Sequence, residues 1–185
     1  MLPHNLNELF AHIYEKLHYL HVQINQVHSP DLKLISGYCY TGTGPTGASG
    51  RISYTMGLRG PCMTIDTACS SALTCTHVAI QALRNNDCKI AVVGAASIIS
   101  EPAQSLNFCR LGALSPEARC KSFDDAANGY IRSEGVCVMI IKKLEDAQKD
   151  GDNILAIIKG SAVNQDGKSK RLTAPSTAAQ GLMHN

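Results

Sequence analysis

The chain has 185 residues, which is about the length of one domain with a core of its own. Its 44% hydrophobic and 17% charged content is that of a globular protein and excludes a disordered one. The net charge of +2 gives no argument for nucleic acid or a membrane surface as a partner, and no apolar run is long enough for a membrane span. The first residues lack a signal pattern, and none of the eight cysteines forms a C-x-x-C pair. We therefore expect a reduced, cytoplasmic protein without a bound metal.

Residues 5–28 have the pattern of an amphipathic helix. Apolar residues recur there at steps of three and four, at Leu6, Leu9, Phe10, Ile13, Leu17, Leu20 and Ile24. The pair His18 and His21 has no carboxylate or cysteine at matching spacing. We therefore interpret these histidines as surface residues of the helix and not as metal ligands.

A glycine-rich segment follows a short apolar stretch at residues 34–40. Its spacing G-x-G-x-x-G is formed by Gly42, Gly44 and Gly47. Asp66 lies a little over twenty positions further on, as in a dinucleotide-binding fingerprint. The connecting helix of such a site would have to contain Gly50 and Gly57, and each interior glycine costs about 1 kcal/mol. We therefore favour a glycine turn before a short helix at residues 51–58, and keep a dinucleotide site as the alternative.

Cys69 lies where a predicted strand turns into a predicted helix. Residues 62–65 form a short apolar run that indicates a buried strand, and a helical pattern then continues to about Asn85. The free N–H groups at the start of a helix and the positive end of its dipole stabilise negative charge. A thiolate is the nucleophilic form of cysteine, and the strand–turn–nucleophile–helix order is that of the nucleophile elbow in acyl-transfer enzymes. The alternative is that Cys69 is a small buried hydrophobe.

His77 lies eight positions after Cys69 on the predicted helix. At about 1.5 Å per residue this separation is some 12 Å along the axis, beyond the reach of a general base. We therefore interpret His77 as a satisfied core or interface histidine.

The rest of the chain alternates between apolar strands and short helices. Strands are predicted at residues 90–96, 136–141 and 154–163, helices at 102–111 and 144–149, and a polar loop at 121–135. Because the strands are apolar throughout, the pattern predicts an α/β fold with a mostly parallel, buried sheet and helices on both faces.

Seven short motifs point to one enzyme family. They lie at residues 50–54 (GRISY), 66–71 (DTACSS), 114–116 (LSP), 120–124 (CKSFD), 129–135 (GYIRSEG), 160–167 (GSAVNQDG) and 172–175 (LTAP). In this order and spacing they resemble the N-terminal half of the β-ketoacyl synthase (ketosynthase) domain of modular polyketide synthases and fatty-acid synthases. The resemblance covers the chain from about Gly42 onward. We therefore divide it into a divergent N-terminal helical segment, residues 1–35, and a partial ketosynthase domain, residues 36–185.

The resemblance implies a thiolase-like fold, in which two similar α/β halves form five layers and the protein is a homodimer. It implies that Cys69 accepts an acyl chain from the phosphopantetheine of an acyl carrier protein. A malonyl-type extender is then decarboxylated and attacks the acyl thioester, giving a β-ketoacyl product. The backbone N–H of Cys69 would donate to the oxyanion. No bound cofactor or metal is implied.

The sequence departs from the family at several points. The two family histidines, in a His-Gly-Thr-Gly-Thr motif and a later Gly-His pair, have no counterpart, and the family's first strand is replaced by the predicted helix. Ser133 stands where glycine is usual, and Lys170 and Arg171 replace a small neutral pair. We expect a condensing acyltransferase of which these residues are a fragment. The alternative is a catalytically incomplete dimerisation or carrier-docking module.

Overall fold

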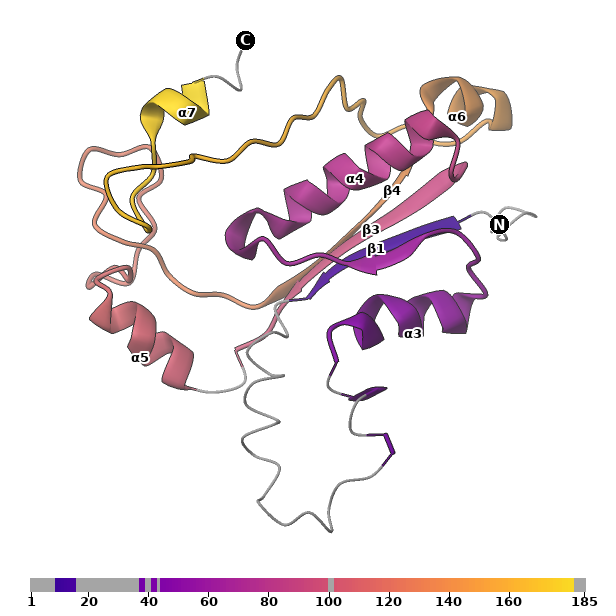
Figure 1. Cartoon of the computed structure of the whole chain (residues 1–185). Coiled ribbons are helices and arrows are strands. Elements are labelled where there is room, and N and C mark those ends of the chain that lie inside the picture. Colours follow the sequence, from indigo (N-terminus) through magenta and orange to yellow (C-terminus); the bar gives the residue numbers. More distant parts are fainter. Residues whose placement is uncertain (1–8, 16–36, 39–40, 43, 100–101, 182–185) are drawn as a thin grey trace.

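The structure, a computed structural model, describes residues 9–15, 37–38, 41–42, 44–99 and 102–181. Its centre is a sheet of four strands in the order β2-β1-β3-β4 (Figure 1). The strands are β1 (Leu9–Glu15), β2 (Cys62–Thr64), β3 (Ile90–Ser97) and β4 (Gly135–Lys142). β1 runs parallel to both β2 and β3, whereas β4 is antiparallel to β3. The prediction of a mostly parallel sheet is confirmed, with an antiparallel strand at one edge.

β1 corrects the prediction for the start of the chain. A helix was expected across residues 5–28, but Leu9–Glu15 form a strand between β2 and β3, where Ile13 pairs with both Thr64 and Gly94. A strand with neighbours on both sides takes consecutive apolar residues, so the pairs of adjacent apolar residues fit it as well as they fit a helix. Pairing along two edges then overrides the local helical pattern. The rest of that predicted helix, with His18 and His21, lies outside the described residues.

Helices cover both faces of the sheet, as predicted. On β3, Ala91 and Val93 pack against the small residues Cys75 and Ala79 of helix α4 (Ser71–Asn85). The intervening residue Val92 points to the opposite face and packs against Leu58, which follows helix α3 (Thr46–Met56). Alternate residues of a strand face opposite sides, so this alternation places α3 and α4 on different layers (Figure 1).

The helix ends agree with the turn residues in the sequence. α3 begins earlier than predicted and contains Gly50, and it ends at Gly57, whose φ of 68° is left-handed. α4 ends at Asn86 with φ 62°, and α6 (Leu144–Asp150) ends at Gly151 with φ 71°. Glycine and asparagine tolerate this conformation best, so all three serve as C-caps. The other helices named in the described residues are α5 (Pro102–Arg110) and α7 (Thr177–Gly181).

Two predictions for the second half of the chain are wrong. β4 was expected to be buried, yet Val136, Val138 and Ile140 are 75%, 60% and 72% exposed, because no described element packs on that side of the edge strand. A strand was expected at residues 154–163, but the described structure there is irregular and Leu155 is 90% exposed. A strand forms only with a hydrogen-bonding partner, and none of the described strands pairs with this segment.

A helix that crosses a membrane needs a run of about twenty mostly apolar residues. No helix in the described part of the chain combines this length with this apolarity.

Candidate active site

Cys69 lies in a short 3-10 turn, η3 (Ala68–Ser70), which joins β2 to α4. The preceding residue, Ala68, has φ 57°, a left-handed conformation that is costly for a residue with a side chain. Its backbone N–H donates to Oδ1 of Asp66 at 2.8 Å, which closes the turn. The prediction of a strand, a sharp turn and a helix around Cys69 is confirmed, but the expectation that this strand is buried is wrong, since Cys62 and Met63 of β2 are exposed at the edge of the described sheet.

Hydroxyl groups fix the turn from inside. The fully buried Ser71 accepts a hydrogen bond from the backbone N–H of Thr67 at 2.7 Å and donates to the carbonyl of Ala68 at 2.6 Å. The Thr67 hydroxyl lies 2.9 Å from that of Ser70 and 3.1 Å from that of Thr74. The backbone on both sides of Cys69 is therefore held by side chains. These contacts keep Ala68 in its unfavourable left-handed conformation.

The cysteine itself points outward from this fixed turn. Cys69 is exposed, so the alternative that it is a buried hydrophobe is wrong. Cys75 and Cys88, by contrast, are buried. Burial raises the pKa of both thiols, that of Cys88 to about 11, where Asp87 adds to the effect and Lys143 opposes it. A thiol that stays protonated is a poor nucleophile, so these two are structural.

An aromatic side chain that was not predicted, Tyr130, lies within electrostatic range of Cys69. Burial raises the pKa of the Tyr130 phenol, the charge of Arg132 lowers it, and a charge on Cys69 raises it further. The Tyr130 and Cys69 side chains are thus close enough to interact electrostatically. The only signal in the sequence was that Tyr130 falls within the family motif at residues 129–135, in a segment predicted simply as a loop.

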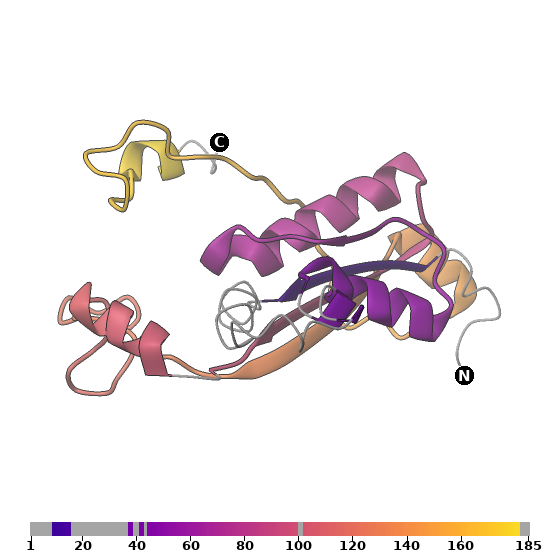
Figure 2. The same ribbon diagram turned by 60° about the horizontal axis from the view of Figure 1, so that its bottom comes forward.

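Tyr130 and Arg132 are joined to helix α5 through Phe108. The rings of Phe108 and Tyr130 meet edge to face with centroids 6.0 Å apart, and Cζ of Arg132 lies 5.5 Å from the centre of the Phe108 ring. The guanidinium also donates to Ser105 at 2.6 Å and to Gln104. In both views α5 lies at the end of the molecule where α4 begins (Figures 1 and 2). The aromatic pair and the guanidinium therefore link the loop that contains Tyr130 and Arg132 to α5, at the end of the molecule where α4 begins.

His77 has a hydrogen-bond partner, as a satisfied histidine was predicted to have. Its Nδ1 lies 2.9 Å from the Ser161 hydroxyl, which ties α4 to the irregular segment after α6. This partner supports the interpretation of an interface histidine.

The other candidate features do not build a site in the described residues. The Asp66 carboxylate, the acidic residue of the glycine fingerprint, is used inside the Cys69 turn. Within the described ranges no group of three or more acidic, histidine or cysteine residues could hold a metal ion. Ser133 is not among the residues with positive φ, so serine meets no backbone strain at this position.

Comparison with known proteins identifies the family. Residues 16–147 match the family described as beta-ketoacyl synthase, N-terminal domain. Two different subunits of the phenolphthiocerol/phthiocerol polyketide synthase of Mycobacterium tuberculosis are similar to the chain. One is 47% identical over 146 residues, which cover 79% of this chain and 7% of the relative. The other is 48% identical over 146 residues, which cover 79% and 10%.

Solved structures give the same result. The ketosynthase from module 6 of the bacillaene synthase of Bacillus subtilis superimposes with a TM-score of 0.81 and 36% identity, covering 97% of this chain and 29% of that one. An oxazolomycin ketosynthase domain from Streptomyces albus gives 0.76 and 31%, covering 94% and 30%. The chain belongs to the β-ketoacyl synthase family and has the thiolase-like fold of its ketosynthases. It spans under a third of those solved chains and at most a tenth of the two mycobacterial relatives. The predicted division into residues 1–35 and 36–185 stays a prediction.

Proposed function

We propose that Cys69 is the acyl-accepting nucleophile of a β-ketoacyl synthase that acts in polyketide or fatty-acid synthesis. The observation that carries this proposal is the exposed thiol of Cys69 on a hydrogen-bonded turn at the start of α4, in a chain of the ketosynthase family. The positive end of the α4 dipole favours negative charge at the sulfur.

The reaction begins with acyl transfer. Sγ of Cys69 attacks the carbonyl of an acyl thioester carried on phosphopantetheine, the negative charge moves to the carbonyl oxygen, and the backbone N–H of Cys69 donates to it. The carbon–sulfur bond to phosphopantetheine then breaks, and the carrier thiol leaves with the proton that Cys69 gave up. The acyl group is now a thioester of Cys69.

Condensation follows on the same thioester. A malonyl-type extender on a carrier protein loses CO2, and the carbanion formed attacks the acyl carbonyl on Cys69. Cys69 leaves as thiolate and the β-ketoacyl chain remains on the carrier. The family's two histidine motifs are not in these 185 residues, so the chain itself supports only the acylation step.

The partners follow from this chemistry. An acyl carrier protein delivers both substrates, and a homodimer is the assembly that the family resemblance implies. β2 is one edge of the described sheet and its residues Cys62 and Met63 are exposed, so it can pair with a second copy. The seven described cysteines are all free, which supports a reducing, cytoplasmic location.

The proposal is tested by covalent labelling of the intact natural protein with hexanoyl-pantetheine. Peptide mass spectrometry is expected to find the hexanoyl group on Cys69, and none on the Cys69→Ala variant. Cys137→Ala, which removes another exposed cysteine, is the matched control and keeps full labelling. Equal labelling of several exposed cysteines would show that Cys69 has no special reactivity.

A second function is favoured by the exposed apolar side chains of β4. Val136, Val138 and Ile140 suit a chain that docks against another protein surface and has no catalytic role. A stable dimer that binds carrier protein but shows no hexanoyl transfer to Cys69 would support this docking module and refute the acyltransferase.

A further inference from the structure

The backbone of Tyr130 is hydrogen-bonded to an earlier part of the same loop. The Tyr130 N–H donates to the carbonyl of Ala113, and the Ser115 N–H donates to the carbonyl of Tyr130, both at 3.0 Å. Gly129, with φ 136°, makes this approach possible, because a Cβ there would lie 2.5 Å from backbone atoms of Leu114 and Ser115. The position of Tyr130 therefore depends on how well the segments at residues 113–117 and 128–130 stay together.

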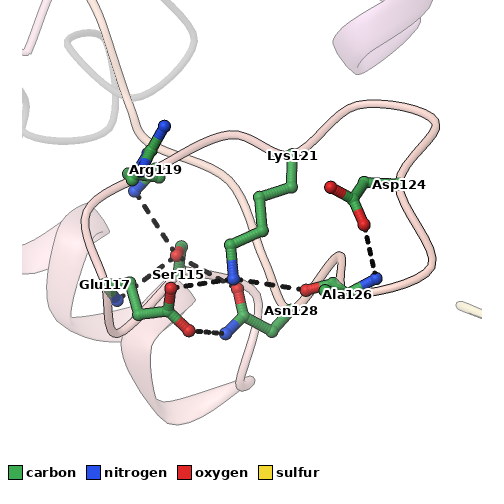
Figure 3. Close-up of polar contacts among 7 residues, drawn as sticks. All are labelled: Ser115, Glu117, Arg119, Lys121, Asp124, Ala126 and Asn128. Atoms are coloured by element: carbon green, nitrogen blue, oxygen red, sulfur yellow. Dashed lines mark hydrogen bonds and ion pairs between the residues drawn. The ribbon is translucent and has the colours of Figure 1, made fainter.

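The Asn128 side chain joins these two segments (Figure 3). Its Nδ2 donates to Oε1 of Glu117 at 2.9 Å, and its Oδ1 accepts from the Ser115 hydroxyl at 3.2 Å. One side chain must both donate and accept here, which an amide does and an ionised carboxylate does not. Asparagine at position 128 thus matches a carboxylate at position 117.

Lys121 holds the other oxygen of the Glu117 carboxylate. Its Nζ lies 2.8 Å from Oε2 of Glu117 and 3.4 Å from the carbonyl of Ala126. Lys121 first and Asn128 second lower the pKa of Glu117, so the carboxylate is the form that the cluster stabilises. The carboxylate of Glu117 is therefore fixed between a cation and an amide. Asn128 directly precedes Gly129 and Tyr130 in the chain, so its bond to this carboxylate also fixes their position.

We propose that the Asn128–Glu117 pair is a positioning device that holds Tyr130 against Phe108, at the end of the molecule where the Cys69 turn leads into α4, so that Tyr130 guides an acyl donor to the sulfur. The role depends on the proposed function of Cys69. Tyr130 is held on one side by its backbone hydrogen bonds to Ala113 and Ser115, and on the other side by the ring of Phe108. Loss of the Asn128–Glu117 pair therefore weakens one of these two supports. Asn128 and Glu117 are positioning residues, because their side chains bond to the loop and act on Cys69 only through Tyr130.

The pair can be reversed without changing the net charge. In Asn128→Asp two carboxylates face each other, and the donor to Glu117 is gone. In Glu117→Gln the new amide oxygen still accepts from Asn128, so the effect is small. In the double variant, Glu117→Gln with Asn128→Asp, the amide now at position 117 donates to the carboxylate now at position 128. This restores the hydrogen bond in the opposite direction and leaves one carboxylate near Lys121.

The experiment measures two rates at Cys69 in the intact natural protein by peptide mass spectrometry. Hexanoyl-pantetheine reports acyl transfer, and iodoacetamide reports the accessibility of the thiol to a small reagent. Asn128→Asp is expected to slow hexanoyl transfer by about tenfold, with the iodoacetamide rate within about twofold of the natural protein. The double variant is expected to recover hexanoyl transfer to within about threefold of the natural rate. Asp125→Asn, which removes a carboxylate elsewhere in this loop, is the control and leaves both rates unchanged.

Three results would overturn the positioning role. They are an unchanged hexanoyl rate in Asn128→Asp, a double variant no faster than Asn128→Asp, and equal slowing of both reagents, which marks general damage to the fold. The proposed function fails in a different experiment, because there Cys69→Ala would keep its hexanoyl labelling. Hydrogen exchange of the peptide covering residues 113–131 shows in each variant whether the backbone hydrogen bonds between Tyr130 and residues 113 and 115 have broken.

Discussion

Individual side chains decide how Cys69 is presented. The left-handed Ala68 would relax in an unsupported loop, and it is kept in place by one bond to Asp66 and by the buried hydroxyl of Ser71. Each of these groups bonds to backbone and lies within the turn. The turn thus carries its own supports and does not depend on distant contacts to hold its shape.

Replacing Asp66 tests this support. Asp66→Ala removes the acceptor of the Ala68 N–H, so we expect hexanoyl transfer to Cys69 to slow by about tenfold. Asp66→Asn keeps an oxygen acceptor of the same shape and is expected to stay within about threefold of the natural rate. Labelling rates of the two variants by mass spectrometry check this. Equal slowing of both would mean that the negative charge of Asp66 matters and the hydrogen bond does not.

The buried thiol of Cys88 makes the stability of the fold depend on pH. Its pKa is raised to about 11, whereas an unfolded thiol ionises at about 8.5. The folded chain therefore keeps a proton that the unfolded chain loses, and the stability that this gives is complete below about pH 8.5 and falls as the pH rises toward about 11.

Removing the thiol removes this dependence. Melting temperatures measured between about pH 8 and pH 11 are expected to fall more steeply for the natural protein than for Cys88→Ala. Cys137→Ala, at an exposed position, is expected to follow the natural protein. Parallel curves for the natural protein and Cys88→Ala would contradict the pKa shift at Cys88.

At the scale of elements, α4 is where sequence and structure agree best. Its helical pattern and its end near Asn85 were both predicted, because local spacing alone determines them. The same holds for the turn at Cys69, which follows from a short apolar run next to a helical pattern. Tyr130 was missed because its position is set by backbone bonds between segments about fifteen residues apart, which no local pattern records.

The strands were harder to predict than the helices for a related reason. The sequence of β1 fits a helix and a doubly paired strand equally well, and only its neighbours β2 and β3 decide between them. Residues 154–163 show the opposite error, since a strand pattern without a described partner stays irregular. Apolar content thus predicts that a segment needs a partner, and does not say whether the partner is there.

Close packing of α4 on β3 leads to a prediction for Ala79. This residue is completely buried against the strand, so Ala79→Leu forces extra methyl groups into a filled interface and is expected to destabilise α4 by about 1–3 kcal/mol. Arg84→Ala, at an exposed position of the same helix, is expected to change stability by less than about 0.5 kcal/mol. Hydrogen exchange of the α4 amides measures both. Unchanged protection in Ala79→Leu would show that the interface has free space.

At the scale of the whole molecule, buried and exposed apolar groups are separated. The small residues of α4 and β3 form a closed core, whereas the outer side of β4 and residues 154–163 expose large apolar side chains. Exposed apolar surface of this extent is typical of regions that contact other protein surfaces. The Cys69 turn is stabilised by local contacts, whereas the exposed apolar surfaces of β4 and residues 154–163 are suited to contact with other protein surfaces.

The charge of the tail suggests where a carrier protein docks. Three cations near the end of the chain are exposed and have no ion pair among the described residues: Lys168, Lys170 and Arg171. Their combined positive charge exceeds the net charge of +2 of the whole chain. The neighbouring helix α7 lies at the end of the molecule where α4 begins (Figures 1 and 2). Positive charge at this end of the molecule would accelerate encounter with an acidic partner and would be screened by salt.

We therefore expect the double change Lys170→Ala and Arg171→Ala to act on carrier-bound substrate alone. The KM for hexanoyl carrier protein should rise by about tenfold at low salt, and the difference from the natural protein should shrink in about 0.5 M salt because screening removes the attraction in both. The rate with free hexanoyl-pantetheine should not change, since this donor has no acidic protein surface. Lys149→Ala, an exposed cation on α6 at the other end of the molecule, is the control. A rise in KM for both donors would mean that the two residues contact the pantetheine and not the carrier protein. An unchanged KM for both donors would mean that Lys170 and Arg171 have no role in substrate delivery.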